Sequence, residues 1–142
     1  MTADDRLAIE WACTRLINLY ANLNDAGQWE NLVALYAEDG LMIRPSAPDT
    51  PVVGKPALLA SFLARPPRAS RHVCANIVVT VESATTARAE SNILLFTGAI
   101  DPDGGLPMRD AAPPLVGRYD DRLVLTDAGW RFAERRGTLC FR

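Results

Sequence analysis

The chain has 142 residues, of which 49% are hydrophobic and 23% charged, and this is enough for one domain with a buried core. Its 17 acidic and 15 basic residues are interspersed and leave a net charge of −2, which argues against a nucleic-acid-binding surface. The three cysteines form no CxxC pair, which argues against both a disulfide framework and a zinc ribbon.

The N-terminus carries acidic residues, Asp4 and Asp5, where a signal peptide would carry basic ones. The apolar runs are only a few residues long, which argues against a membrane-spanning segment. We therefore expect a soluble, cytoplasmic protein with a single domain over residues 1–142. One histidine and no paired cysteines are too few ligands for a metal site, so no metal is expected.

Apolar residues at helical spacing predict two helices at the start of the chain. The first is expected from about residue 3 to 23, with a capping box at residues 2–5. The second is short, covers residues 29–36 and stops at 38–40. Asp25 lies in the tight connection between them, where it either caps the second helix or belongs to a site.

A proline-rich segment separates these helices from a third one. Residues 41–44 predict a short strand, and residues 45–56, with four prolines and Gly54, predict a loop. The third helix is expected from about Pro56 to Ala64, because proline suits the first helical turn.

From residue 70 onward the apolar period changes to two, which is typical of strands. The expected strands are 70–82, 86–100, 115–126 and 130–141. Short connections join most of them and predict an antiparallel meander. Residues 101–114 form a long excursion that is able to cover the mouth of a pocket.

Three helices followed by a long sheet predict an α+β fold, because the sheet must wrap around the helices to bury its apolar face. A curved, mixed but mostly antiparallel sheet of this kind makes a cone-shaped barrel that is closed at one end. We expect a small hydrophobic molecule to bind at the open end.

His72 is the only histidine, and its ordinary pKa makes it the first candidate for proton transfer near neutral pH. Strand alternation places His72, Cys74 and Asn76 on one face and the odd-numbered residues 73–79 on the other. A lone histidine on a strand is also common as a hydrogen-bonded structural residue. Both interpretations are open.

Arg135 is a candidate for binding an anion on the last expected strand. Alternation places Arg131, Ala133 and Arg135 on one face of this strand. The alternative interpretation is a solvated charge on the strand.

Several short motifs occur in an order and spacing that is typical of a known family. They are Tyr20-x4-Asp25-x-Gly27-x-Trp29, Leu35-Tyr36-Ala37-Glu38-Asp39-Gly40, Arg71-His72-x3-Asn76, Gly117-x-Tyr119-x-Asp121 and Gly129-Trp130-x-Phe132-x3-Arg136. Together they resemble the SnoaL-like branch of the NTF2-like superfamily over nearly the whole chain. The resemblance implies a homodimer that pairs through the outer face of the sheet.

In the dehydratases and dehydrohalogenases of this superfamily, those similar to scytalone dehydratase and hexachlorocyclohexane dehydrochlorinase, an aspartate after the first helix orients a histidine on a strand. Asp25 and His72 fall on these two positions. The resemblance implies that His72 abstracts a proton from carbon while Asp25 holds its tautomer. It also implies that Arg135 stabilises a leaving group or a developing anion, without a cofactor.

The chain departs from these relatives at two positions of the pocket. It lacks the second histidine of scytalone dehydratase, and it has Tyr20 where the dehydrochlorinase has lysine. A tyrosine is still able to donate a hydrogen bond to a substrate oxygen. Further substrate-binding candidates are the aromatic, apolar and amide residues Trp29, Tyr36, Met42, Phe62, Asn76, Asn92 and Tyr119.

The preferred hypothesis is a small lyase or isomerase that acts on a hydrophobic, cyclic or carbonyl-bearing molecule. Dehydration, dehydrohalogenation and proton transfer of the ketosteroid isomerase type are the reactions considered. A non-catalytic ligand-binding or dimerisation module explains the same residues. A partner subunit of a ring-hydroxylating oxygenase is a third interpretation, since a fold does not determine a function.

Overall fold

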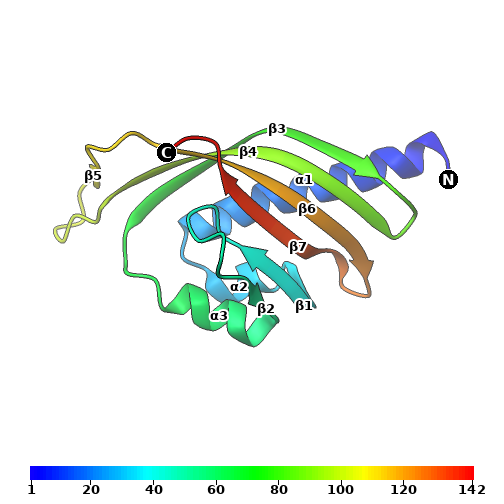
Figure 1. The fold of residues 1–142 in the computed structure, drawn as a ribbon, viewed down its shortest axis with the longest axis horizontal. Helices are drawn as coiled ribbons and strands as arrows, with labels where there is room; N and C mark the ends of the chain where they lie inside the picture. The colour runs from blue at the N-terminus through cyan, green and yellow to red at the C-terminus, as the bar shows by residue number, and fades with distance from the viewer.

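The structure is a computed structural model that describes all 142 residues, and it contains three helices and seven strands (Figure 1). In chain order these are α1 (Ala3–Asp25), α2 (Trp29–Val33), β1 (Tyr36–Ile43), β2 (Val52–Val53), α3 (Lys55–Leu63), β3 (Ala69–Val81), β4 (Thr86–Ala99), β5 (Met108–Arg109), β6 (Leu115–Thr126) and β7 (Gly129–Leu139). None of the helices is long and apolar enough to cross a membrane.

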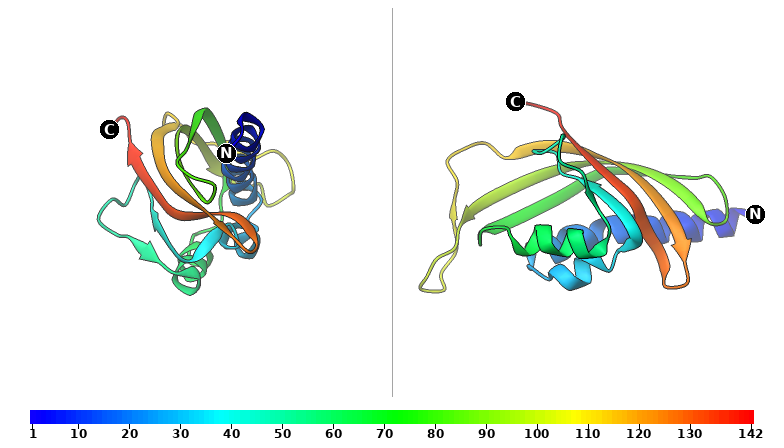
Figure 2. Two further views of the ribbon diagram at one scale, coloured as in Figure 1. Left: turned by 90° about the vertical axis from the view of Figure 1, so that its right-hand side faces the viewer. Right: turned by 60° about the horizontal axis from the view of Figure 1, so that its bottom comes forward.

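All seven strands belong to one mixed sheet. Six of them follow the order β2-β1-β7-β6-β4-β3, and β5 pairs with the end of β4. Every pairing is antiparallel except that of β1 with β7, so the expected meander of four long strands is confirmed. The sheet curves around the helices and stays open between its edge strands β2 and β3 (Figure 2). The predicted cone-shaped α+β fold is therefore confirmed.

The core lies between α1 and the concave face of the sheet. Residues at helical spacing on α1, from Ile9 to Tyr20, are buried, and the helix packs along β3. At the centre, the Tyr20 ring meets the Phe132 ring edge-on, with 5.5 Å between their centroids. A residue of α1 and a residue of β7 thus fix the helix against the sheet, near the end of α1 that carries Asp25.

The start of α1 is as expected, and its end lies two residues further along. Thr2 and Asp5 form the predicted capping box, with each side chain accepting a hydrogen bond from the other residue's backbone N–H. The helix continues to Asp25. Asp25 does not cap α2, because the N-cap of α2 is Gln28 and makes no side-chain capping bond. The capping interpretation of Asp25 is therefore wrong.

The prediction of a helix over residues 29–36 is wrong at its C-terminal end. The helix α2 stops at Val33, and β1 already begins at Tyr36. Tyr36 pairs with Phe132 of β7, so a long-range strand pairing overrides the local helical spacing. Gly40 makes this strand possible, because a Cβ there would lie 2.9 Å from the Tyr36 ring.

An irregularity in β3 reverses its expected faces. The pairing of β3 with β4 shifts between Ala75 and Val78, and Asn76 has a φ of +53°, so the strand contains a bulge. His72 and Ile77 therefore point to the same, inner side, while Asn76 is exposed. The prediction that Asn76 shares the face of His72 is wrong, because the extra residue breaks the period of two.

A second irregularity lies in β7. Its pairing with β6 shifts between Arg122 and Leu123, and Phe132 and Arg135 are both fully buried as a result. The prediction that Arg131, Ala133 and Arg135 share one face is therefore wrong. Arg135 points into the core, beside Phe132.

Candidate active site

A cavity of about 350 Å³ opens at the end of the cone where α1 ends and α3 leads into β3. Its apolar wall includes Met42, Phe62, Ile93, Leu95 and Leu115. Its polar groups are Tyr20, Asn24, Arg44, Ser46, Arg65, Arg68, His72 and Tyr119. The volume is at the small end of the range of about 300–1,000 Å³ for ligand pockets. A larger hollow of about 550 Å³ on the outer face of the sheet is lined mostly by charged residues and contains none of the predicted site residues.

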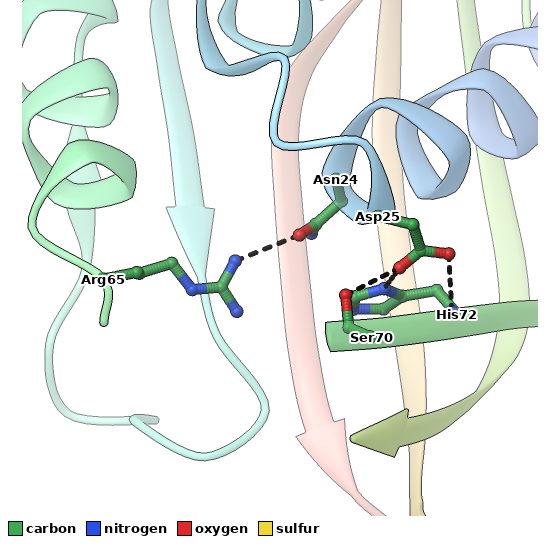
Figure 3. A network of polar contacts seen from close by, with 5 residues as sticks. All are labelled: Asn24, Asp25, Arg65, Ser70 and His72. Atoms are coloured by element: carbon green, nitrogen blue, oxygen red, sulfur yellow. Dashed lines mark hydrogen bonds and ion pairs between the residues drawn. The ribbon is translucent and has the colours of Figure 1, made fainter. Parts of the chain in front are cut away.

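The imidazole of His72 is held by Asp25 from behind (Figure 3). Nδ1 of His72 lies 2.6 Å from Oδ1 of Asp25, and the backbone N–H of His72 donates to Oδ2 at 2.9 Å. The hydroxyl of Ser70 also donates to Oδ1 of Asp25, at 2.9 Å. Because the carboxylate accepts the proton of Nδ1, Nε2 is left as the unprotonated nitrogen, and it makes no hydrogen bond with the protein.

These hydrogen bonds stabilise the carboxylate of Asp25 at an otherwise unfavourable position. Asp25 is the last residue of α1, where the partial negative charge of the helix terminus disfavours a carboxylate. Two neighbouring residues of β3, Ser70 and His72, supply the donors that offset this effect, and the Asp25 side chain is only 6% exposed. The dyad is therefore a contact between the end of α1 and the start of β3.

The charge state of His72 follows from its surroundings. Burial lowers its pKa below the ordinary value of 6.5, the hydrogen bond and charge of Asp25 raise it, and the charges of Arg65 and Arg68 lower it. The net effect on the pKa is downward. At neutral pH the imidazole is therefore neutral and able to accept a proton.

Arg135 lies behind the cavity wall. It is 1% exposed, and its guanidinium lies over the rings of Tyr20 and Tyr119, at 4.3 and 3.9 Å from their centroids. Its counter-ion is Asp121, with Nε 3.3 Å from Oδ1. Burial raises the pKa of Asp121 to about 6 although the charge of Arg135 opposes this effect, so most of this carboxylate is still charged at neutral pH. The guanidinium of Arg135 thus lies behind the two tyrosines that line the cavity, with its charge offset by Asp121.

Comparison with known proteins now places the chain in a family. The sequence model of the SnoaL-like domain family matches residues 5–136 of the chain. The chain belongs to the SnoaL-like domain family. The resemblance found in its sequence motifs is thereby confirmed. No curated protein has a significantly similar sequence.

Solved structures similar to this SnoaL-like domain include two proteins from Novosphingobium species. One, from Novosphingobium aromaticivorans, is provisionally assigned as a scytalone dehydratase and shares 23% identity, with a TM-score of 0.80 over 99% of this chain and 89% of the other. A hexachlorocyclohexane dehydrochlorinase from Novosphingobium barchaimii shares 17% identity, with a TM-score of 0.79 over 99% and 92%. At these identities the similarity establishes the fold.

A third similar structure carries the name of the fold. It is an NTF2-like protein with a cystatin-like fold from Novosphingobium aromaticivorans, 24% identical, with a TM-score of 0.74 over 95% of this chain and 84% of the other. Over 95% of its length, this SnoaL-like domain thus has the same fold as that protein.

Several predicted site residues come together in the SnoaL-like domain. The predicted residues that line the cavity are Tyr20, Met42, Phe62, His72 and Tyr119. Tyr36 is fully buried and its hydroxyl lies 3.0 Å from that of Tyr20, so it supports the wall from behind. Trp29 stacks on Phe62 at 5.3 Å on the side away from the cavity.

Two predicted binding residues lie away from the cavity. Asn76 is exposed at the bulge of β3, and Asn92 is exposed on the outer face of β4. The buried and exposed residues of β4 alternate around Asn92, with Ser91 and Ile93 facing inward. The assignment of both asparagines to a substrate pocket is therefore not supported by their positions.

The segment that was expected to cover the pocket mouth lies beside the cavity and does not line it. None of residues 101–114 lines the cavity with His72. Part of this segment instead borders an adjacent hollow of about 360 Å³, which shares Arg68, Leu95 and Leu115 with the cavity, and β5 pairs with the end of β4. Figure 1 shows the excursion at the far end of β4.

Besides Asn24 and Ser46, which line the cavity, four polar residues of the site were not predicted from the sequence. Arg44, Arg65 and Arg68 line the cavity, and Ser70 holds Asp25. Alternation along β3 places Ser70 on the face of His72, which is a signal for this residue. The arginines lie in irregular segments next to prolines, where no periodicity indicates their direction.

Proposed function

We propose that this SnoaL-like protein is a cofactor-independent lyase or isomerase that removes a proton from a carbon atom of a small, largely apolar molecule. The observation that carries the proposal is the 2.6 Å contact between Nδ1 of His72 and Asp25, on an imidazole that lines an apolar cavity. An oriented neutral imidazole with a free Nε2 is the requirement for a general base.

In the proposed reaction, Nε2 of His72 takes the proton as the C–H bond breaks, and Asp25 stabilises the imidazolium that forms. In an elimination, the electron pair of the C–H bond forms a double bond and expels a leaving group on the adjacent carbon. In an isomerisation, the pair moves onto a carbonyl oxygen, and the imidazolium returns the proton to another carbon. No external oxidant or reductant is needed.

The tyrosine hydroxyls are the proposed partners of the negative charge that develops. Burial raises the pKa of Tyr20 and Tyr119, so both remain neutral donors. Hydrogen-bond donors directed at a developing oxyanion stabilise it most in a site that excludes water. Arg135 is a positioning residue in this scheme, because it acts through the two rings and does not line the cavity.

The experiment measures exchange of carbon-bound hydrogen for deuterium in D₂O, by NMR, with a panel of small cyclic ketones and halogenated rings. We expect exchange or elimination with the wild type and a loss of at least about 100-fold in His72→Gln, since a general base contributes about 10²–10⁴-fold. Asn92→Ala, on the outer face of the sheet, is the matched control and keeps the wild-type rate. Ligands that bind but do not exchange with the wild type would support the ligand-binding module instead.

A further inference from the structure

The cavity contains three arginine side chains and no carboxylate on its lining. Arg44, Arg65 and Arg68 border it, and none of the three lies within ion-pair distance of an acidic side chain. By contrast, Arg118 on the outer face of the sheet is paired with both Glu90 and Asp120. Three cations without a counter-ion thus border the cavity that contains His72.

Two of these guanidinium groups are held in fixed positions. Those of Arg44 and Arg65 lie over the ring of Phe62, at 5.2 and 5.6 Å from its centroid. Each also donates one hydrogen bond to a neutral acceptor, Arg44 to the carbonyl of Ser61 at 3.2 Å and Arg65 to the side-chain oxygen of Asn24 at 3.1 Å. Their other N–H groups make no hydrogen bond within the protein and are available to a ligand.

The grouping of the cations is unfavourable in the free protein. Burial lowers the pKa of Arg65, and the charges of Arg44 and Arg68 lower it further. An anion bound among the three would remove this repulsion and use the free N–H groups. The structure therefore has a preference for a negatively charged ligand group at this end of the cavity.

We propose that the substrate carries a carboxylate, which binds to Arg65 and Arg44 beside Phe62, while its apolar body lies against the cavity wall and presents its acidic C–H to His72. The planar fork of a guanidinium matches a carboxylate in a bidentate arrangement. The cavity of about 350 Å³ corresponds to about a dozen water volumes, which suits a single ring with its carboxylate. This inference rests on the proposed function, whose substrate class it specifies.

The same arginines couple ligand binding to the base. The charged groups that act on His72 are Asp25 of α1 and Arg65 and Arg68 of the segment between α3 and β3. Since these two cations lower the pKa of His72, an anion that offsets them raises it. A carboxylate substrate thus strengthens the base that acts on it.

The test uses the single imidazole of His72, followed by NMR, as a probe of both binding and pKa. The probes are benzoate and cyclohex-1-ene-1-carboxylate, each compared with its uncharged primary amide. We expect each carboxylate to bind at least about tenfold more tightly than its amide, a difference of about 1.4 kcal/mol, and to raise the pKa of His72 at saturation. Arg65→Gln removes the preference, and Arg118→Gln, outside the cavity, keeps it.

Circular dichroism checks that both variants are folded, and Arg44→Gln serves as a second cavity variant. Carboxylates that bind no more tightly than the amides in the wild type overturn the proposal. A preference that is unchanged in both Arg65→Gln and Arg44→Gln also overturns it. These measurements need no turnover, so a failure of the carboxylate proposal is distinct from a failure of the exchange experiment with His72→Gln.

Discussion

The carboxylate of Asp25 accepts three hydrogen bonds, and two of them come from His72. One of the two fixes the backbone of His72 and the other fixes its ring, so a single side chain determines where Nε2 lies. The same contact opposes the effect of burial on the pKa of the imidazole. Both functions of Asp25, positioning and charge stabilisation, therefore depend on the carboxylate, because an isosteric amide has one accepting oxygen in place of the two that His72 uses.

Replacing Asp25 by Asn is expected to lower the pKa of His72 further below 6.5. The charge of Asp25 raises this pKa, whereas burial and Arg65 lower it, so only the lowering effects remain in Asp25→Asn. An NMR titration of the imidazole resonances measures this directly, because the chain has one histidine. Asp127→Asn, in the exposed turn between β6 and β7, is the control that leaves the pKa unchanged. An unchanged pKa in Asp25→Asn would contradict the dyad.

The buried pair of Arg135 and Asp121 is expected to contribute strongly to stability. Asp121→Asn leaves the Arg135 charge buried without a counter-ion, so we expect unfolding free energy to fall by about 3–5 kcal/mol. Asp120→Asn is the adjacent control, because its pair with Arg118 is about half exposed, and a loss below about 1 kcal/mol is expected. Urea denaturation of both variants gives the comparison. Equal losses would show that Arg135 does not depend on Asp121.

At the residue scale, the sequence indicated His72 as a candidate base by itself, but it paired His72 with Asp25 only through the family resemblance. Asp25 and His72 are 47 positions apart, and no local pattern indicates that they touch. Arg65 was not predicted as a site residue, since its direction depends on its contacts with Phe62 and Asn24. Long-range contacts of this kind have no periodic signal.

Among the elements, β3 does the most to shape the site, because a bulge divides it into two parts. Before the bulge, Ser70 and His72 face the end of α1, and after it Ile77 and Val79 pack against the core. Without the extra residue, one of these two groups would face solvent. The bulge thus lets one strand serve both the dyad and the core.

Long strands with a clear period of two were predictable, and the interruptions of that period were not. The four long strands are found within one or two residues of their expected bounds. The bulge at Asn76 and the start of β1 at Tyr36 both depend on the neighbouring strand. Local propensity contains no information about a partner strand that lies far away in the chain.

The bulge predicts an unusual order of stability among variants of Asn76. At a φ of +53°, a β-branched residue is strained and glycine is not, so Asn76→Val is expected to be less stable than Asn76→Gly by about 1–2 kcal/mol. At Thr80, an exposed position of the same strand with ordinary backbone, the order is reversed and the valine variant is the more stable. Thermal unfolding of the four variants tests the inversion. The same order at both positions would contradict a left-handed residue at 76.

At the scale of the whole molecule, the two faces of the sheet differ in what covers them. The helices lie against the concave face, and no element of the chain covers the convex face (Figure 2). Val73 and Val78 are exposed there, at 47% and 60%, among charged residues that pair across the strands. A second copy of the chain is the partner implied by the family resemblance, and an isologous contact would bury these valines twice.

We therefore expect a homodimer that pairs through the convex face. Sedimentation equilibrium at micromolar concentration should give twice the 15.5 kDa of one chain. Val78→Glu would introduce a charge into the paired surface and shift the mass toward that of one chain, since an unpaired charge is costly to bury. Leu106→Glu is the control, because Leu106 is 93% exposed in the excursion before β5, away from this face. A wild-type mass of one chain would contradict the dimer, and an unchanged mass in Val78→Glu would place the contact on another surface.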